Sequence, residues 1–443
     1  MALKEKMDMS IGLLNKLTLL KITFRSLRYR NFRLFFAGQT ISLIGTWIQR
    51  IATPWLVYHL TDSAFILGFI GFIGQLPTFL FAPLAGVITD SCNRYRILIV
   101  TQLLAMLQAL TLALLYLTGK IAVWHVAILS VFLGCINALD TPARQSLVVE
   151  MIDNKDDLSN AIALNSSMVN GARLLGPSIA GVLIATMGEG ICFLLNGISY
   201  IFVIVSLLMM RMMGPSTTKQ MVSGKVLTDL KEGIKYTFGF APIRAVILLL
   251  ALISLVGMPY SILMPIFARD ILNGSSHTFG FLMGASGIGA LIAALYLASR
   301  KSVLGRGKVI PLAASVFGVG LILFSLSRVF IISLILMLIV GLGMMLQLAS
   351  SNTILQTIVD DDKRGRVMSF YTMAFMGTAP FGSLLAGISS SFIGAPNTLI
   401  IGGVLCVGGG IIFFRKLQEL RKMIRPIYIK KGIITSGISV SES

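Results

Sequence analysis

The chain has 443 residues, of which 56% are hydrophobic and only 12% are charged, and its formal net charge is +19. Soluble domains carry about 25% charged residues, so this composition excludes an ordinary water-soluble enzyme. A strongly basic balance suits either a nucleic-acid-binding protein or the cytoplasmic face of a membrane protein, and the positions of the charges must decide between them.

Twelve stretches are long and apolar enough to span a membrane, because a bilayer core needs about 20 apolar residues. We therefore predict an all-α polytopic membrane protein with two six-helix halves, 34–210 and 243–414, joined by a basic linker at 211–242. In the linker, LTDLKEGIKYTF has the apolar spacing of an amphipathic surface helix, although a flexible linker is the alternative. The predicted spans, in chain order, are 34–58, 65–88, 97–117, 122–150, 161–186, 189–210, 243–267, 279–298, 308–326, 330–358, 367–393 and 396–414.

The basic residues lie on alternate loops of this topology. Only Lys120, Arg269 and Arg328 fall on one side, and Arg50 and Arg173 fall inside spans, which leaves 32 of the 37 Lys and Arg on the other side. That side includes the basic N-terminal arm, 1–33, and the basic tail, 415–443. The positive-inside rule then predicts that both termini are cytoplasmic. Because the charges are scattered over loops, we expect no nucleic-acid partner.

Cysteine and histidine usage offers no metal site or disulfide framework. The four cysteines form no CxxC pair, and the three histidines are far apart in sequence. The N-terminus does not have the pattern of a cleavable signal peptide. We expect no cofactor, no metal and no enzymatic activity.

The two halves are related by a weak internal repeat at an offset of 206 residues. Residues 176–181 read GPSIAG and residues 382–387 read GSLLAG, while Gly188 aligns with Gly394. Parallel repeats of this kind build one group of secondary transporters, whose substrate site lies near mid-membrane between the halves.

The end of the second predicted span carries a charged motif, Gly86-Val-Ile-Thr-Asp90-Ser-Cys-Asn-Arg94-Tyr-Arg96. It resembles the loop 2–3 signature of the major facilitator superfamily. In that signature, a carboxylate and basic residues form a charge network that holds one conformation, and this implies a gating role for Asp90 and Arg94. The copy is imperfect, because Ser91 replaces a usual basic residue and Asn93 a usual glycine. A plain positive-inside loop is the alternative.

The fifth span contains Gly171-Ala-Arg-Leu-Leu-Gly176-Pro177-Ser-Ile-Ala-Gly181. Proline bends a helix, and small residues let a neighbouring helix approach closely. The stretch is similar to the span 5 Gly-Pro motif of exporters in the superfamily, which implies gating by Gly176 and Pro177 and transport out of the cell. A packing kink is the alternative.

Three further stretches narrow the resemblance: residues 26–49, residues 138–152 with 160–167, and RGRVMSFY at 364–371. Together they are similar to the branch that contains the enterobactin exporter and related efflux permeases, over about 25–415. The resemblance implies a twelve-helix major facilitator fold in the bacterial inner membrane, a proton gradient as the energy source, and a monomer. A periplasmic or outer-membrane efflux partner is a further expectation.

Two arginines inside predicted spans are candidates for substrate contact. Arg50 lies about 17 residues, or ~25 Å, into its span, and Arg173 lies near the middle of its own. Arginine keeps its charge, and no Asp or Glu lies at comparable depth, so an anionic substrate would suit the site. Trp47 is on the same helical face as Arg50, which suits an aromatic anion. The alternative is that each arginine snorkels or pairs with backbone carbonyls.

Other intramembrane polar residues are weaker candidates. Asp140 and Arg144 have the i,i+4 spacing of an ion pair, which is either a gate or proton-linked switch or a static salt bridge. By elimination, Asp140 is the candidate proton carrier. Asp360, Asp361 and Asp362 lie next to basic residues and favour a solvated loop over a metal site. Candidates for hydrogen bonds into the cavity, or for interhelical contacts, are Gln39, Asn165, Asn170 and Gln347.

These observations predict a secondary transporter that exports a small amphipathic anion, such as a siderophore, by alternating access and proton antiport. Broad drug efflux of a macrolide-like type is the main alternative. A lipid flippase is a more distant one. The expected partners are the small-molecule substrate, the lipid bilayer and the efflux partner named above.

Overall fold

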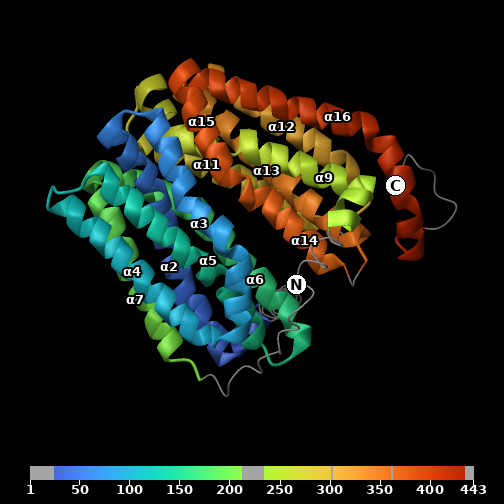
Figure 1. The fold of residues 1–443 in the computed structure, drawn as a ribbon, viewed down its shortest axis with the longest axis horizontal. Coiled ribbons are helices and arrows are strands. Elements are labelled where there is room, and N and C mark those ends of the chain that lie inside the picture. The colour runs from blue at the N-terminus through green and yellow to red at the C-terminus, as the bar shows by residue number, and fades with distance from the viewer. Residues whose placement is uncertain (1–23, 212–233, 301–302, 361–362, 435–443) are drawn as a thin grey trace, which may run out of the picture.

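A computed structural model of the protein describes residues 24–211, 234–300, 303–360 and 363–434, except for the side chains of 82, 83, 86, 87, 90, 91 and 155 (Figure 1). The secondary structure of the described residues is helical. After the short 3-10 helix η1 (Arg25–Arg28), the elements are α2 (Arg30–Thr61), α3 (Ala64–Ser91), α4 (Arg94–Leu117), α5 (Val123–Glu150), α6 (Lys155–Met187), α7 (Glu189–Leu208), α9 (Ala241–Leu252), η2 (Ile253–Gly257), α10 (Tyr260–Ile266), η3 (Phe267–Ile271), α11 (Ser276–Ser299), α12 (Arg306–Leu326), α13 (Phe330–Ile358), α14 (Arg364–Thr372), η4 (Met373–Gly377), α15 (Ala379–Ile393) and α16 (Ala395–Lys430).

Ten helical segments in the described part of the chain are long and apolar enough to cross a membrane. The segment Ala241–Ile271, which runs through α9, η2, α10 and η3, counts as one of them. Two other long segments, α2 and the run α14–η4–α15, pack among these ten but are less apolar. In α2 the polar content comes from side chains such as Gln39, Gln49 and Arg50. A polytopic helical membrane protein is therefore confirmed, while the count of twelve spans and the cytoplasmic termini stay predictions.

The helices pack into two bundles, which Figure 1 shows side by side in blue to green and in yellow to red. In the first bundle, α2 packs on α6 and α7, α4 packs on α5 and α7, and α3 packs on α5. In the second, α12 packs on α13 and α16, and α11 packs on α13. The bundles meet along two helix pairs, α3 with α15 and α6 with α11.

Glycines allow the two bundles to touch backbone to backbone. A Cβ atom on Gly68 of α3 would lie 2.6 Å from the Cα of Gly387 on α15. A Cβ on Gly181 of α6 would lie 2.7 Å from the Cα of Gly280 on α11. No side chain fits at these distances, so the pairs hold the helices in close van der Waals contact, as small residues do in membranes.

The internal repeat reappears in this geometry. Gly181 and Gly387 occupy equivalent positions in the repeat, and each packs on a glycine of the opposite bundle. Gly188 and Gly394, also equivalent, have φ values of 81° and 83° and join consecutive helices. A left-handed φ is accessible to glycine at little cost, so these junctions explain why both positions carry it.

Three π-helical segments, η2, η3 and η4, interrupt helices of the second bundle. Pro259 follows η2 and Pro380 follows η4, and proline removes one donor from the backbone ladder. The predicted spans 243–267 and 367–393 are therefore each composed of shorter helices. Such π-helical turns are frequent at functional sites.

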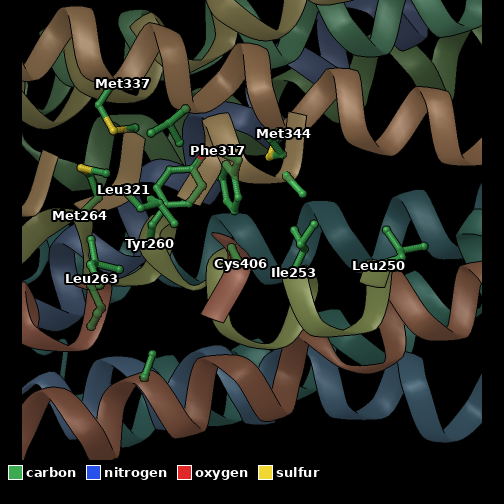
Figure 2. Close-up of a cluster of buried hydrophobic side chains, with 14 of the residues drawn as sticks. Leu250, Ile253, Tyr260, Leu263, Met264, Phe317, Leu321, Met337, Met344 and Cys406 are labelled. Carbon is green, nitrogen blue, oxygen red and sulfur yellow. The ribbon is translucent and has the colours of Figure 1, made fainter. Parts of the chain in front are cut away.

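The core of the second bundle is apolar and well filled. Figure 2 shows Phe317, Leu321, Tyr260, Met344 and Cys406 gathered between α10, α12, α13 and α16. The rings of Tyr260 and Phe317 meet edge to face, with their centroids 6.2 Å apart. These contacts tie α10, α12, α13 and α16 to one another.

The structure describes parts of two segments that the sequence predicts to be cytoplasmic. Helix α16 continues to Lys430, well past the predicted end of its span at 414. Of the predicted linker helix 227–238, only 234–238 lies in the described part, and it is helical there, with Tyr236 donating a hydrogen bond to Asp360 over 3.0 Å. Asp361 and Asp362 lie outside the described residues.

Candidate functional site

A cationic cluster lies where α2 faces α6. The guanidinium carbon of Arg50 is 4.8 Å from the ring centroid of Trp47, and that of Arg173 is 5.3 Å from the same ring. Both contacts are cation–π interactions, which stabilise a charge by about 0.5–2 kcal/mol depending on its solvation. The structure thus brings together the three residues that the sequence singled out as substrate contacts, and we call them the Arg-Trp-Arg cluster.

The Gly-Pro motif of α6 makes room for this cluster. A Cβ atom on Gly176 would lie 2.4 Å from the Cβ of Trp47, so only glycine lets the tryptophan pack against α6. Pro177 follows directly, and its carbonyl oxygen would lie 2.9 Å from a Cβ on Gly280 of α11. The motif therefore serves two contacts at once, one to Trp47 and one to the opposite bundle.

The positive charge of the cluster has no protein counter-ion among the described residues. None of the ion pairs found there includes Arg50 or Arg173. The Nε of Arg173 is buried and makes no hydrogen bond, while Arg50 keeps an exposed side chain. A buried donor without a partner costs about 1–3 kcal/mol, and more when it is charged. One indole ring does not offset this cost, so the geometry suits an anion.

The second bundle approaches the cluster with hydroxyl groups. Tyr260 of α10 interacts electrostatically with Arg173, and its hydroxyl lies 2.9 Å from that of Ser286 on α11. On the same helix, a Cβ on Gly287 would lie 3.4 Å from the Arg173 carbonyl oxygen. Arg173 therefore sits at the crossing of α6 and α11, where the two bundles meet.

Buried amides behind the cluster hold the first bundle together. Gln49 donates to Gln108 of α4 over 2.9 Å, and its carbonyl oxygen accepts from Asn196 of α7 over 2.6 Å. Interhelical hydrogen bonds of this kind stabilise membrane bundles by about 0.6 kcal/mol each. Because Gln49 directly precedes Arg50, these hydrogen bonds also fix the rotation of α2 about its own axis at Arg50.

The predicted pair Asp140 and Arg144 is present on α5, with Nη2 and Oδ2 3.4 Å apart. Asp140 is buried and also accepts hydrogen bonds from Gln102 over 2.7 Å and from Thr101 over 3.1 Å, both on α4. The carboxylate is thus fully coordinated by its own bundle. This arrangement accommodates either a switch or a static bridge, and the role of Asp140 stays a prediction.

The loop 2–3 motif makes a contact that the sequence did not suggest. Arg94 forms an ion pair with Glu150 at the end of α5, and its Nε donates to the Thr89 carbonyl over 3.3 Å. The side chain of Asp90 lies outside the described residues. Arg94 and Glu150 are 56 residues apart in the chain, so the sequence did not indicate this pair, and the gating role of Asp90 and Arg94 stays a prediction.

At one end of the molecule the bundles are joined by charged and aromatic side chains. We call this the outer end, since the predicted topology puts its loops outside. Arg269 forms an ion pair with Asp62, and Tyr58 donates a hydrogen bond to Asp270. The rings of Trp55 and Phe279 stack with centroids 5.7 Å apart. These contacts hold the two bundles together at the outer end.

A buried carboxylate also lies near the outer end. Glu189 begins α7 and accepts a hydrogen bond of 2.5 Å from Tyr116, while His59 Nδ1 lies 3.2 Å from its other oxygen. Sequence reasoning passed over Glu189, and also Asp62 and Asp270. The only signal was that Arg269, a rare basic residue on this side, is followed by an acidic one.

The remaining predicted site residues do not join the cluster. Gln39 is 3% exposed and Gln347 is 1% exposed, the latter donating to Ser351 over 3.2 Å. Asn170 donates to the Ser166 carbonyl of its own helix over 2.9 Å, and Asn165 is half-buried on the same helix. Burial makes Gln39 and Gln347 better suited to interhelical contact than to a ligand. Their predicted roles stay untested.

The segment at residues 25–29 is anchored to α6. Arg25 and Arg28 form ion pairs with Asp157 at 3.1 and 2.6 Å, and the Tyr29 hydroxyl donates to it over 2.9 Å. The hydrogen bond to Tyr29 and the Asp157 carboxylate raise the pKa of Arg28. The arm thus clamps the start of the helix that carries Arg173.

No group of three or more His, Cys, Asp or Glu side chains in the described residues is placed to hold a metal ion. Of the four free cysteines, Cys192 and Cys406 are buried.

Known membrane proteins resemble this chain over most of its length. The family of transmembrane secretion effectors matches residues 21–425. The staphyloferrin A transporter of Staphylococcus aureus is 28% identical over 388 residues, covering 87% of this chain and 96% of the relative. Macrolide efflux protein A of Streptococcus pyogenes is 22% identical, covering 89% and 99%. The multidrug efflux pump Tap of Mycolicibacterium fortuitum is 25% identical, covering 86% and 95%.

Solved structures are similar in fold. An inward-facing bacterial homologue of the human lysosomal transporter Spinster has a TM-score of 0.68 at 13% identity, covering 89% of this chain and 98% of that one. An inward-facing bacterial homologue of the iron transporter ferroportin has a TM-score of 0.65 at 16% identity, covering 88% and 98%.

Proposed function

We propose, from the premise that this chain belongs to the transmembrane secretion effector family of the major facilitator superfamily, that it exports a small amphipathic anion such as a siderophore. It is a multi-pass membrane transporter with efflux proteins among its relatives. The single observation that carries the substrate proposal is the Arg-Trp-Arg cluster, two arginines on one indole with no counter-ion among the described residues.

The proposed transport cycle uses the contacts between the bundles. Rocking about the α3–α15 and α6–α11 contacts would open the outer end, where Tyr58, Asp62, Arg269 and Asp270 now hold the bundles together. Because Arg173 lies on α6 at this interface, a ligand bound to it is well placed to influence the motion. Alternating access of this kind is how transporters with two parallel repeats operate.

A second candidate function is efflux of macrolide-like drugs, supported by the similarity to macrolide efflux protein A. The charge of the site opposes it. Two arginines without a counter-ion among the described residues repel a cationic ligand. The anion is therefore the better-supported substrate.

The test is transport by the full-length protein in inside-out proteoliposomes, with staphyloferrin A as the probe. We expect uptake, and we expect Arg50→Gln and Arg173→Gln each to lower it by about tenfold or more, because each removes a charge-assisted interaction of roughly 1.5–3 kcal/mol. Arg244→Gln, which changes an exposed arginine on α9, is the matched control and should transport normally. Transport of erythromycin but not of staphyloferrin A would favour the macrolide alternative.

Proton antiport in the bacterial inner membrane is part of the proposal, with Asp140 as the carrier. In the same proteoliposomes, Asp140→Asn should abolish the stimulation by an imposed pH gradient while preserving exchange of substrate at equal pH. An unchanged response to the gradient would assign Asp140 to a static bridge with Arg144. We also propose that the chain works as a monomer. We further propose that it acts with a periplasmic or outer-membrane efflux partner.

A further inference from the structure

The geometry of the Arg-Trp-Arg cluster carries information about the number of charges on its ligand. The contact distances of 4.8 Å and 5.3 Å to one ring centroid put the two guanidinium carbons no more than about 10 Å apart. The arginines also repel one another at this separation. Resting on the proposed function, we propose that the site takes a ligand with two acidic groups, one for each arginine.

Charge balance favours two acidic groups over one. A mono-acid would compensate one guanidinium and leave the other without a counter-ion in a site where no described carboxylate pairs with it. A diacid compensates both and removes their mutual repulsion. A guanidinium is planar and binds a carboxylate through two parallel hydrogen bonds, so each arginine takes one whole carboxylate.

The distance sets the size of the ligand. Because the guanidinium carbons are no more than about 10 Å apart, two carboxylates that each pair with one of them are also held within the span of a small molecule. Two carboxylates separated by a short, rigid linker, such as the 1,3-positions of a benzene ring, meet this requirement. A long flexible diacid would lose conformational entropy on binding.

The second bundle supplies polar groups for the same ligand. Tyr260 and Ser286 share a single hydrogen bond between two hydroxyls, so one hydroxyl hydrogen is left for another acceptor. Tyr260 is buried and close enough to Arg173 to interact with it electrostatically. In the proposed complex, a carboxylate on Arg173 accepts that hydrogen and connects the two bundles.

The experiment measures binding rather than transport. Trp47 is one of three tryptophans in the chain, so the full-length Trp55→Phe/Trp124→Phe variant reports on Trp47 fluorescence alone. The probes are isophthalate, benzoate and isophthalamide, which share a benzene ring and carry two, one and no carboxylates. We expect isophthalate to bind at least tenfold more tightly than benzoate, and isophthalamide not to bind.

Substitutions of the two arginines then test whether each of them binds one of the two carboxylates. Arg50→Gln and Arg173→Gln should each reduce isophthalate affinity to that of benzoate, whereas Arg50→Lys, which keeps the charge, should preserve most of the difference. Arg244→Gln is again the control. Tyr260→Phe should weaken isophthalate binding by a smaller factor, because it removes one hydroxyl.

Equal affinities of isophthalate and benzoate, or no binding of isophthalate, would overturn the proposal. Its failure is distinguishable from failure of the proposed function. If staphyloferrin A is still exported and depends on Arg50 and Arg173, the exporter stands and only the two-acid requirement is wrong. If isophthalate binds as expected but no siderophore is transported, the site is retained and the substrate must be another diacid.

Discussion

Two glycines on α6 have opposite roles, although they are only five residues apart. Gly176 lies against the Cβ of Trp47, whereas a Cβ on Gly171 would meet no atom within 4 Å. At Gly176 the missing side chain allows a contact that positions the tryptophan. At Gly171 no neighbouring atom among the described residues requires a missing side chain. Alanine substitutions at the two positions can therefore be compared directly.

We expect Gly176→Ala to displace Trp47 from α6, because the added methyl group would lie 2.4 Å from its Cβ. Overpacking of this kind costs about 1–3 kcal/mol. Thermal unfolding in detergent should show a lower midpoint, and ligand affinity should fall, since both arginines stack on the displaced ring.

Gly171→Ala should have neither effect, and its better helix propensity favours a neutral or slightly stabilised protein. Equal destabilisation by Gly171→Ala and Gly176→Ala would contradict the role given to Trp47. It would instead indicate that α6 needs glycine for flexibility along its whole length.

At the scale of elements, two helix pairs carry the contact between the bundles. Glycines line both pairs, and the outer-end contacts of Tyr58 and Asp62 with the second bundle add polar links. Where two helices touch through glycines, little side-chain entropy is lost when they meet. No interlocked side chains have to separate when they part. Such a surface can separate and close again, which alternating access requires.

A disulfide across α3 and α15 tests whether this contact opens during transport. A Cβ on Gly71 would lie 3.2 Å from the Cβ of Ser383, close to the 3.5–4.5 Å range of a disulfide. With the four native cysteines replaced by alanine, Gly71→Cys/Ser383→Cys should cross-link under oxidation and stop transport, and reduction should restore it.

Each single cysteine variant serves as a control and should transport in both conditions. Continued transport by the fully cross-linked protein would show that α3 and α15 stay together throughout the cycle. The motion would then have to be assigned to the α6–α11 contact alone.

At the scale of the whole molecule, the cationic cluster and the acidic side chains lie in different parts of the protein. The Arg-Trp-Arg cluster is cationic, and the outer end carries Asp62, Glu189 and Asp270 against Arg269 and His59. An anion that leaves the cluster outward moves negative charge across the membrane. The inside-negative potential of a living cell favours that direction.

Export should therefore respond to membrane potential even without a pH gradient. Each negative charge moved across 100 mV changes the driving force by about 2.3 kcal/mol, so a ligand with two charges gains roughly twice that. In proteoliposomes with potassium and valinomycin, a potential negative on the cytoplasmic face should raise the steady-state accumulation of staphyloferrin A. Accumulation that does not depend on the potential would contradict net charge movement and require compensating cations.

Much of the fold was predictable because a bilayer imposes simple rules. Apolar length identifies helices that cross a membrane, and the ten such segments in the described chain all coincide with predicted spans. The motifs at 86–96 and 171–181 were sufficient to predict the family that the comparisons found. The π-helical turns and the length of α16 were not predicted, since they depend on local backbone pairing and on contacts outside the membrane.

The sequence by itself determined that the chain is a membrane transporter of this family, and that Arg50 and Arg173 lack an acidic partner at their depth. Only the tertiary structure decided that both arginines stack on Trp47, that Gly176 makes this possible, and that Glu150 and Asp270 are the partners of Arg94 and Tyr58. The physical reason is that helix propensity and hydrophobicity are properties of consecutive residues, so they can be read directly from the sequence. Contacts between side chains more than a hundred residues apart, such as Tyr58 and Asp270, depend on how whole helices pack.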